Sequence, residues 1–266
     1  MVIYVNSSFH HLGNSTLSYV LTKMYGNWMS QRSLLISLGD NFFLSSSCIS
    51  YPEGHEFPGL QMMVNKSGGA GSFMSSCFKM EDTVFYYAAN NVPMKSESDL
   101  DMVRRLITKA KNDFGFIVVD GGCKVNSFTD VASVIDTVVI TAPPDIQKLK
   151  QTRESVIHSM IRYEDRFGVA FKPNIVYVVP NYDNVPSRTK IQNALQATSA
   201  NCRFIRYSRE LHDKRNERDL DYYITDLLGG TRTSDQRLLL VDYRQLLDKL
   251  SNIKLPSKKI KKEVTI

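Results

Sequence analysis

The stretch VIYVNSSFHHLGNSTLSYVLTKM, residues 2–24, decides the fold, because it predicts a strand, a loop and a helix in direct succession. Val2–Asn6 is almost entirely apolar, which is typical of a strand covered on both faces of its sheet. From Asn14 to Met29 apolar side chains return at helical spacing, as on the buried face of a helix. These residues therefore predict a βα unit, with Asn6–Thr16 as the loop at the carboxyl end of the strand.

The rest of the chain repeats this alternation of apolar runs and helical segments. The further candidate strands are 33–38, 83–88, 116–120, 136–141, 174–179 and 203–207, and the candidate helices are 99–113, 145–166 and two or three within 209–252. Continuous apolar strands separated by helices predict parallel pairing through right-handed crossovers. We therefore expect an α/β fold, a doubly wound, mostly parallel sheet of about seven strands with helices on both faces.

We expect one domain over residues 1–252, followed by a basic tail over 253–266. Residues 39–82 are rich in Ser, Gly and Asn, which predicts an irregular insertion with one strand near 60–64. The tail holds five lysines and one glutamate, a net +4 of the chain's +6, so the body is nearly balanced. This tail predicts weak contact with an anionic membrane or with DNA, and a disordered, solubilising tail is the alternative.

The composition is that of a globular protein, with 42% apolar and 23% charged residues. It excludes disordered and collagen-like chains. Four cysteines without metal-type spacing predict free thiols in a reducing compartment. A transmembrane helix is not expected, since no apolar run reaches about 18 residues. The first residues enter a strand without the basic and apolar regions of a signal peptide, so we expect a cytoplasmic protein.

The loop Asn6–Thr16 is the candidate site, because ligands of open α/β sheets bind beyond the carboxyl ends of the strands. A phosphate there meets the free N–H groups at the start of the helix. In a P-loop this position reads GxxxxGK[ST]. Gly13 stands where that motif has its second glycine, Asn14 where it has lysine, and Ser15 and Thr16 where hydroxyl residues lie. An ordinary turn that binds no phosphate is the alternative.

The loop and its flanking elements resemble the start of the MinD/ParA-type P-loop ATPases, the deviant Walker A group, whose loop reads KGGxGKTT. Aligned on Gly13, this chain has Phe9 and Asn14 in place of the family's two lysines. The resemblance implies a nucleotide phosphate on Gly13, Asn14, Ser15 and Thr16, with Ser15 as a magnesium ligand. One family lysine contacts the β/γ-phosphates and the other reaches across a dimer, so their loss implies little or no ATP hydrolysis.

Later segments follow the order of the same family over roughly residues 1–210. The stretch FGFIVVDGG, residues 114–122, places Asp120 at the position of the Walker B acid. This implies that Asp120 binds Mg²⁺ or its water, and a satisfied carboxylate at a strand end is the alternative. The stretch SFTDVASVIDTVVITAPPDIQKLKQT, residues 127–152, resembles the family's next helix, strand and helix.

Two further positions bear on the nucleotide. In NIVYVVPNYDN, residues 174–184, Asn181 takes the place of the family's asparagine near the adenine. In LLISLGD, residues 34–40, Ser37 stands where the family has an aspartate that assists catalysis. The resemblance therefore implies a retained scaffold with three parts of the hydrolytic apparatus replaced, and it assigns no catalytic residue.

The resemblance implies a degenerate family member, in the style of the TadZ/CpaE localisation proteins of pilus systems. Such a protein binds ATP or ADP with Mg²⁺, with no nucleotide bound as the alternative, hydrolyses it little or not at all, and forms a homodimer. It acts as a scaffold or positioning factor for protein partners of a bacterial membrane-associated secretion or pilus assembly, at the inner face of the membrane. Two alternatives stay open. One is an active partition ATPase that binds DNA as an ATP-dependent dimer, and the other is an anion- or nucleotide-sensing module.

Overall fold

The structure is a computed structural model that describes residues 1–10, 12–38, 73–80, 83–88, 97–122 and 127–251. The predicted strand near 60–64, most of the predicted insertion and the basic tail lie outside the described residues, as do Cys48 and Cys123. In the part that is described, no helix has the length and apolar character needed to cross a membrane.

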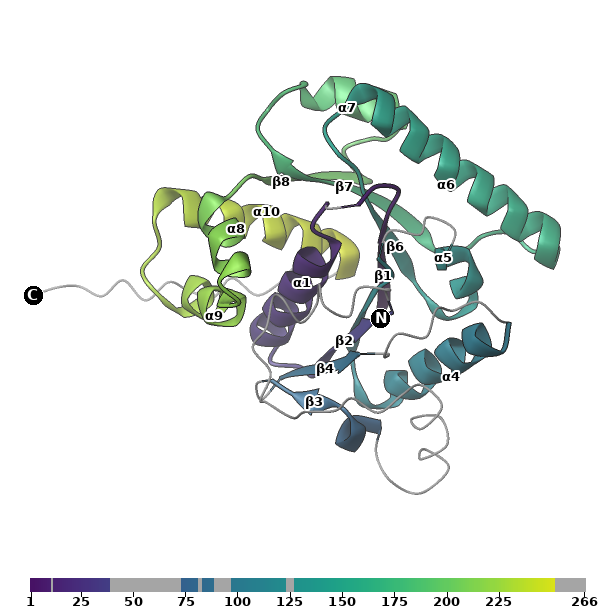
Figure 1. Ribbon diagram of the computed structural model, residues 1–266, viewed down its shortest axis with the longest axis horizontal. Helices are drawn as coiled ribbons and strands as arrows, with labels where there is room; N and C mark the ends of the chain where they lie inside the picture. The colour runs from purple at the N-terminus through teal and green to yellow at the C-terminus, as the bar shows by residue number, and fades with distance from the viewer. Residues whose placement is uncertain (11, 39–72, 81–82, 89–96, 123–126, 252–266) are drawn as a thin grey trace, which may run out of the picture.

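The described residues form an eight-stranded sheet in the order β3-β4-β2-β5-β1-β6-β7-β8 (Figure 1). The strands are β1 (Val2–Ser7), β2 (Ser33–Ser37), β3 (Phe78–Lys79), β4 (Val84–Ala88), β5 (Phe116–Asp120), β6 (Thr137–Thr141), β7 (Asn174–Tyr182) and β8 (Cys202–Arg206). Every neighbouring pair is parallel except β3 and β4. The predicted doubly wound, mostly parallel sheet is confirmed.

The eighth strand, β3, is the addition to the predicted seven. It has two residues, too few to show a pattern in the sequence, and it pairs antiparallel with β4 at one edge of the sheet. At the other edge, the backbone N–H of Arg206 in β8 donates a hydrogen bond to Asp242 of α10 (Ser234–Ser251) at 3.0 Å. Asp242 also accepts from the Arg206 guanidinium at 2.7 and 3.0 Å, which ties this edge strand to a helix.

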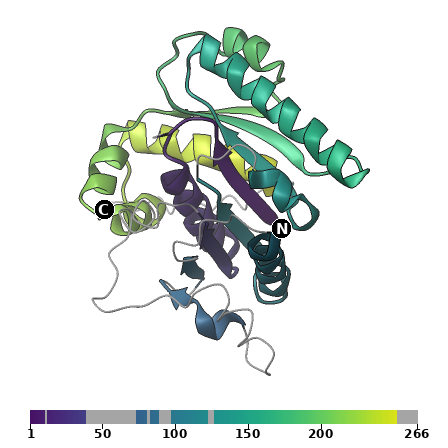
Figure 2. The same cartoon turned by 45° about the vertical axis from the view of Figure 1, so that its right-hand side comes forward.

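Helices cover both faces of the sheet (Figures 1 and 2). One core cluster joins the sheet to α1 (Asn14–Met29), α9 (Leu220–Gly229) and α10. The other joins it to α4 (Glu97–Asp113), α5 (Ser127–Asp130), α6 (Ile146–Phe167) and α7 (Arg188–Leu195). With α8 (Arg209–Asn216), these confirm the predicted helices, including three within 209–252.

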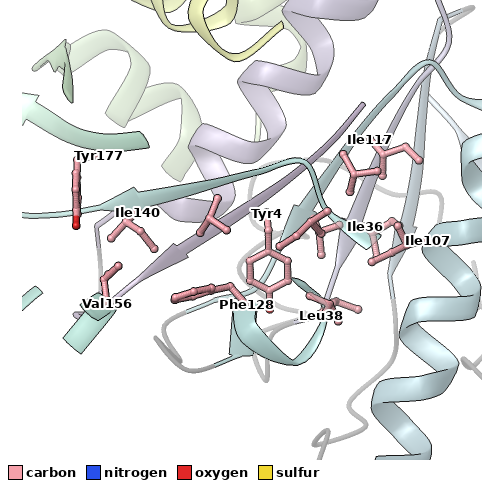
Figure 3. Packing of buried hydrophobic residues seen from close by; sticks show 14 of the residues in the cluster. Tyr4, Ile36, Leu38, Ile107, Ile117, Phe128, Ile140, Val156 and Tyr177 are labelled. Atoms are coloured by element: carbon pink, nitrogen blue, oxygen red, sulfur yellow. The ribbon is translucent and has the colours of Figure 1, made fainter. Parts of the chain in front are cut away.

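Tyr4 of β1 lies in the middle of the second cluster, next to Phe128 and Leu38 in the view of Figure 3. Its side chain is fully buried. Gly121 is the residue that follows β5, the strand beside β1. Its N–H donates a hydrogen bond to the carbonyl of Val5 at 2.9 Å. A Cβ added at Gly121 would collide with the Tyr4 ring, so the glycine lets the chain pass close over this tyrosine.

One ion pair lies inside the packing of α1 against α9. The Lys23 ammonium is fully buried and donates to the Asp221 carboxylate at 2.6 Å, to the Asp221 carbonyl at 2.5 Å and to the Thr225 hydroxyl at 2.6 Å. The Tyr19 hydroxyl donates to the same carboxylate. The Asp221 side chain is 38% exposed, so water still reaches the acid but not the lysine.

Two of the four cysteines lie in the described residues, and both are free thiols. Burial raises the pKa of the Cys202 thiol to about 11, although nearby Arg203 opposes this change. Burial and the negative charge of Asp113 raise the pKa of Cys77 to about 12. Both thiols are therefore protonated, and weakly nucleophilic, at neutral pH.

Candidate functional site

The loop after β1 ends in Gly13, whose φ of +76° is in the left-handed region that favours glycine. Its carbonyl accepts the first helical hydrogen bond, from Leu17 N at 2.8 Å. No side chain caps the start of α1, and its first turn contains no acid. The first N–H groups of α1 are therefore open to an anion at the carboxyl edge of the sheet.

Asn14, at the first helical position, is used inside the protein. Its side-chain amide donates to Ser7 Oγ at 2.9 Å and to the carbonyl of Gly122 at 2.7 Å. Its side-chain oxygen accepts from the Thr141 hydroxyl. Asn14 thus joins the ends of β1 and β6 to the residues that follow β5, in the place where the resembling family has a lysine.

Ser15 and Asp120 form the second polar contact of the site. The Ser15 hydroxyl donates to Asp120 Oδ2 at 2.6 Å, and Gly122 N donates to Asp120 Oδ1 at 3.2 Å. Asp120 pairs in register with Val5 of β1 and with Ser37 of β2, so it lies at the same edge as the loop. The topology therefore brings the hydroxyl of one predicted magnesium ligand against the carboxylate of the other.

The residues present fit a magnesium nucleotide. Hard oxygen ligands suit Mg²⁺, which usually keeps several waters and takes one or two protein carboxylates together with substrate phosphates. Ser15 and Asp120 supply one hydroxyl and one carboxylate of that kind. In the same loop, the Ser8 hydroxyl is buried and has no hydrogen-bond partner among the described residues, so it is a donor that a phosphate oxygen would satisfy. When bound, the metal would neutralise phosphate charge.

The other predicted positions do not all lie next to Asn14, Ser15 and Asp120. Thr16 lies in the first turn of α1 and is largely buried. Asn181 is exposed on β7, at a register shift against β8, with a φ of +55°. Because β6 lies between β1 and β7, the structure does not bring Asn181 against Asn14 or Ser15. Ser37 ends β2 with a buried side chain, so the edge has no acid there.

Four residues of this site were not among the predicted ligands: Ser7, Ser8, Thr141 and Lys148. Ser7 and Thr141 are paired in register at the ends of β1 and β6, which only the strand order reveals. Lys148, in the first turn of α6, lies with its ammonium 5.6 Å from the centre of the Phe9 ring. The sequence signal for Lys148 was its place just after Pro144 and Asp145, the opening of a helix at the end of a predicted strand.

Replacing Asn14 by alanine should lower the free energy of unfolding by about 2 kcal/mol, because the carbonyl of Gly122 and the hydroxyls of Ser7 and Thr141 each lose one hydrogen bond. Urea denaturation of the two proteins measures this difference. Asn27→Ala is the matched control, since that amide donates a 3.2 Å bond to the Lys23 carbonyl within its own helix and does not join strand ends. Equal effects of the two substitutions would contradict the role of Asn14 as the link between strand ends.

Neither the known protein-family models nor the curated proteins give a match to this chain. Solved structures do. A ParA family ATPase from Chlorobium tepidum has a TM-score of 0.70 at 14% identity, covering 92% of this chain and 98% of its own. A putative plasmid partition protein from Borrelia burgdorferi, bound to AMPPNP, gives 0.69 at 13%, covering 95% and 99%. MinD from Pyrococcus horikoshii, complexed with Mg-ADP, gives 0.67 at 12%, covering 96% and 99%. The chain therefore has the fold of the ParA and MinD ATPases.

Proposed function

We propose that this chain binds ATP or ADP with Mg²⁺ at the loop between β1 and α1, and hydrolyses it little or not at all. The observation that carries the proposal is that the neighbouring residues Asn14 and Ser15 make different kinds of contact. The hydroxyl of Ser15 contacts the carboxylate of Asp120, and a magnesium site needs both groups. The side chain of Asn14 instead forms hydrogen bonds within the protein, to Ser7, Gly122 and Thr141. In this proposal the oxygen ligands for Mg²⁺ are present at this edge of the sheet, but Asn14 does not supply the positive charge that activates the phosphates.

The proposed biological role is that of a dimerising scaffold or positioning factor, with partners in a membrane-associated assembly at the inner face of the membrane. The fold supports this, since solved ParA and MinD proteins share it over nearly their whole length. A nucleotide that binds without being hydrolysed would stabilise one conformation or assembly of the protein, and would not drive repeated cycles of binding and release. In this proposal residues 1–252 form one domain, the nucleotide favours the homodimer, and the basic tail adds contact with anionic lipid or DNA.

Binding of Mg-ADP, measured by calorimetry, tests the site. Ser15→Ala and Asp120→Asn should each weaken the Mg²⁺-dependent part of the affinity by about tenfold or more, because each removes one oxygen ligand of the metal. Binding measured with EDTA should change much less in both variants. Thermal melting of the ligand-free variants is the control for folding. Unchanged Mg²⁺ dependence in Asp120→Asn would show instead that Asp120 is a satisfied carboxylate at a strand end.

Phosphate release from Mg-ATP tests the absence of hydrolysis. We expect the wild-type chain to release no more phosphate than its Asp120→Asn variant does. The competing function, an active partition ATPase, is favoured by the AMPPNP-bound partition protein that shares this fold. It predicts ATP-dependent dimerisation, and DNA-stimulated turnover that Asp120→Asn abolishes. Pyrophosphate binding as tight as nucleotide binding would favour the third function, an anion-sensing module.

A further inference from the structure

The crevice between β1 and β6 is the point at which the sheet's connections diverge. β1 leads through α1 to β2 on one side of it, and β6 leads through α6 to β7 on the other. In Figure 1, α1 and α6 accordingly lie on opposite sides of the sheet. Ligands of open α/β sheets bind outside the strand ends at such a switch point. The start of α6 therefore borders the same crevice as the loop after β1.

The segment that forms β1, the loop after it and the first turns of α1 carries no permanently positive side chain. Residues 1–22 contain no lysine and no arginine. The first lysine, Lys23, is buried and bonded to Asp221, so it is not available to a ligand. A polyphosphate on the loop would thus meet backbone N–H groups and hydroxyls from this segment, and its formal charge would need a cation from another element.

Lys148 is a cation that the fold places against the loop. Asp145 caps α6 by accepting a hydrogen bond from the backbone N–H of Lys148 at 2.8 Å, which fixes the lysine in the first turn. Its ammonium lies 5.6 Å from the centre of the Phe9 ring, which belongs to the loop after β1. The contact joins the loop after β1 to the helix after β6, across the switch point.

Helix stability does not explain a lysine at this place. The start of a helix carries partial positive charge, which disfavours a cation in the first turn. The first turn of α6 itself contains no acid, and the carboxylate of Asp145 at the N-cap already accepts from the backbone N–H of Lys148. The Phe9 contact returns about 0.5–1 kcal/mol for an exposed pair, which is comparable to that cost. A bound anion in the crevice would give the lysine a partner, and the unpartnered Ser8 hydroxyl in the same loop also points to an anion there.

We propose that Lys148 supplies the cation that contacts the polyphosphate of the bound nucleotide, in place of the lysines absent at Phe9 and Asn14. The inference rests on the proposed nucleotide site and adds its source of charge. In this arrangement Phe9 holds the Lys148 side chain over the loop before the ligand arrives. Lys148 is a binding residue in this proposal. It belongs to a helix more than 130 positions further along the chain than the loop after β1.

Calorimetry with Mg-ADP and with inorganic pyrophosphate tests Lys148→Gln and Lys148→Arg in the full chain. Lys148→Gln should weaken both ligands by about tenfold, whereas Lys148→Arg keeps the charge and should stay within about twofold of wild type. The matched control is Lys150→Gln, which removes an exposed lysine from the same helix on a different face. The salt dependence of binding should also become shallower in Lys148→Gln alone, since one ionic contact is lost.

The outcomes separate the two proposals. If Lys148→Gln binds as tightly as Lys150→Gln while wild type binds Mg-ADP, the role of Lys148 is wrong and the nucleotide site stands. A loss for Mg-ADP without a loss for pyrophosphate would also overturn it, because the lysine would then contact something other than phosphate. Wild-type chain that binds neither ligand would overturn both. Melting temperatures confirm that each variant is folded, as expected for changes at an exposed lysine.

Discussion

Replacing Asp221 by alanine is expected to lower the free energy of unfolding by about 3 kcal/mol or more, because it removes a carboxylate that is bonded to a buried ammonium. Lys23 is fully buried, and after the substitution the carbonyl of residue 221 and the hydroxyl of Thr225 still accept from its ammonium. Neither group carries a formal charge. Urea denaturation with an unchanged m-value measures the effect.

The reverse substitution, Lys23→Met, should cost much less, about 1 kcal/mol, although it breaks the same ion pair. The Asp221 side chain is 38% exposed, so water replaces the lost lysine, and the Tyr19 hydroxyl still donates to it. Methionine also fills most of the space of the lysine stem. The double variant should then be close to Lys23→Met in stability. Equal losses from the two single variants would show that the pair is solvated from both sides, contrary to the buried position of Lys23.

Gly121→Ala should destabilise the protein by about 3 kcal/mol, because the added methyl group collides with the ring of Tyr4. The tyrosine is fully buried in the middle of the core cluster of Figure 3, and cannot swing aside without moving its neighbours. Gly121 directly follows Asp120, so the shift of backbone would also disturb the Ser15–Asp120 contact and weaken Mg-ADP binding.

Gly229→Ala is the matched control, since nothing lies within 4 Å of a Cβ at that position and the residue ends α9. It should be neutral or stabilise slightly, as alanine favours the helix by up to about 1 kcal/mol over glycine. The collision is checked further in a Tyr4→Leu background, where the shorter side chain leaves space. The Gly121→Ala penalty should shrink there, and an unchanged penalty would assign it to backbone strain instead.

The fold was predictable because most of its strands are continuous runs of apolar residues in the sequence. Phe116–Asp120 and Thr137–Thr141 are fully buried along their length, as the sequence indicated for parallel strands covered on both faces. The strand β3 escaped prediction because two residues have no period, and its pairing depends on β4. The predicted end of β7 at Val179 was short by three residues, since Pro180 and the left-handed Asn181 form an irregularity within the strand.

The site was predictable only where one rule applied, that loops at the carboxyl ends of parallel strands meet at one edge. That rule placed Gly13, Asn14 and Ser15 at the edge of the sheet, the family resemblance added Asp120, and the structure brings these residues together. It gave no ground for the bond between Asn14 and Thr141, which depends on the register of β1 with β6. Lys148 was missed for a similar reason: its place after Pro144 and Asp145 indicated the start of a helix, but only the strand order sets that helix beside the loop.

The two ends of the sheet bear on how copies of this chain can meet. Exposed strand edges invite pairing with other chains, and proteins blunt them with short strands or by covering them. In the described residues β3 offers a two-residue edge, and the backbone N–H of Arg206 in β8 is already taken by Asp242. The first edge is therefore short, and the second has one of its backbone donors occupied by a helix. Self-association should therefore proceed through side chains at a face of the molecule, where a ligand can control it, and edge-driven aggregation should be slow.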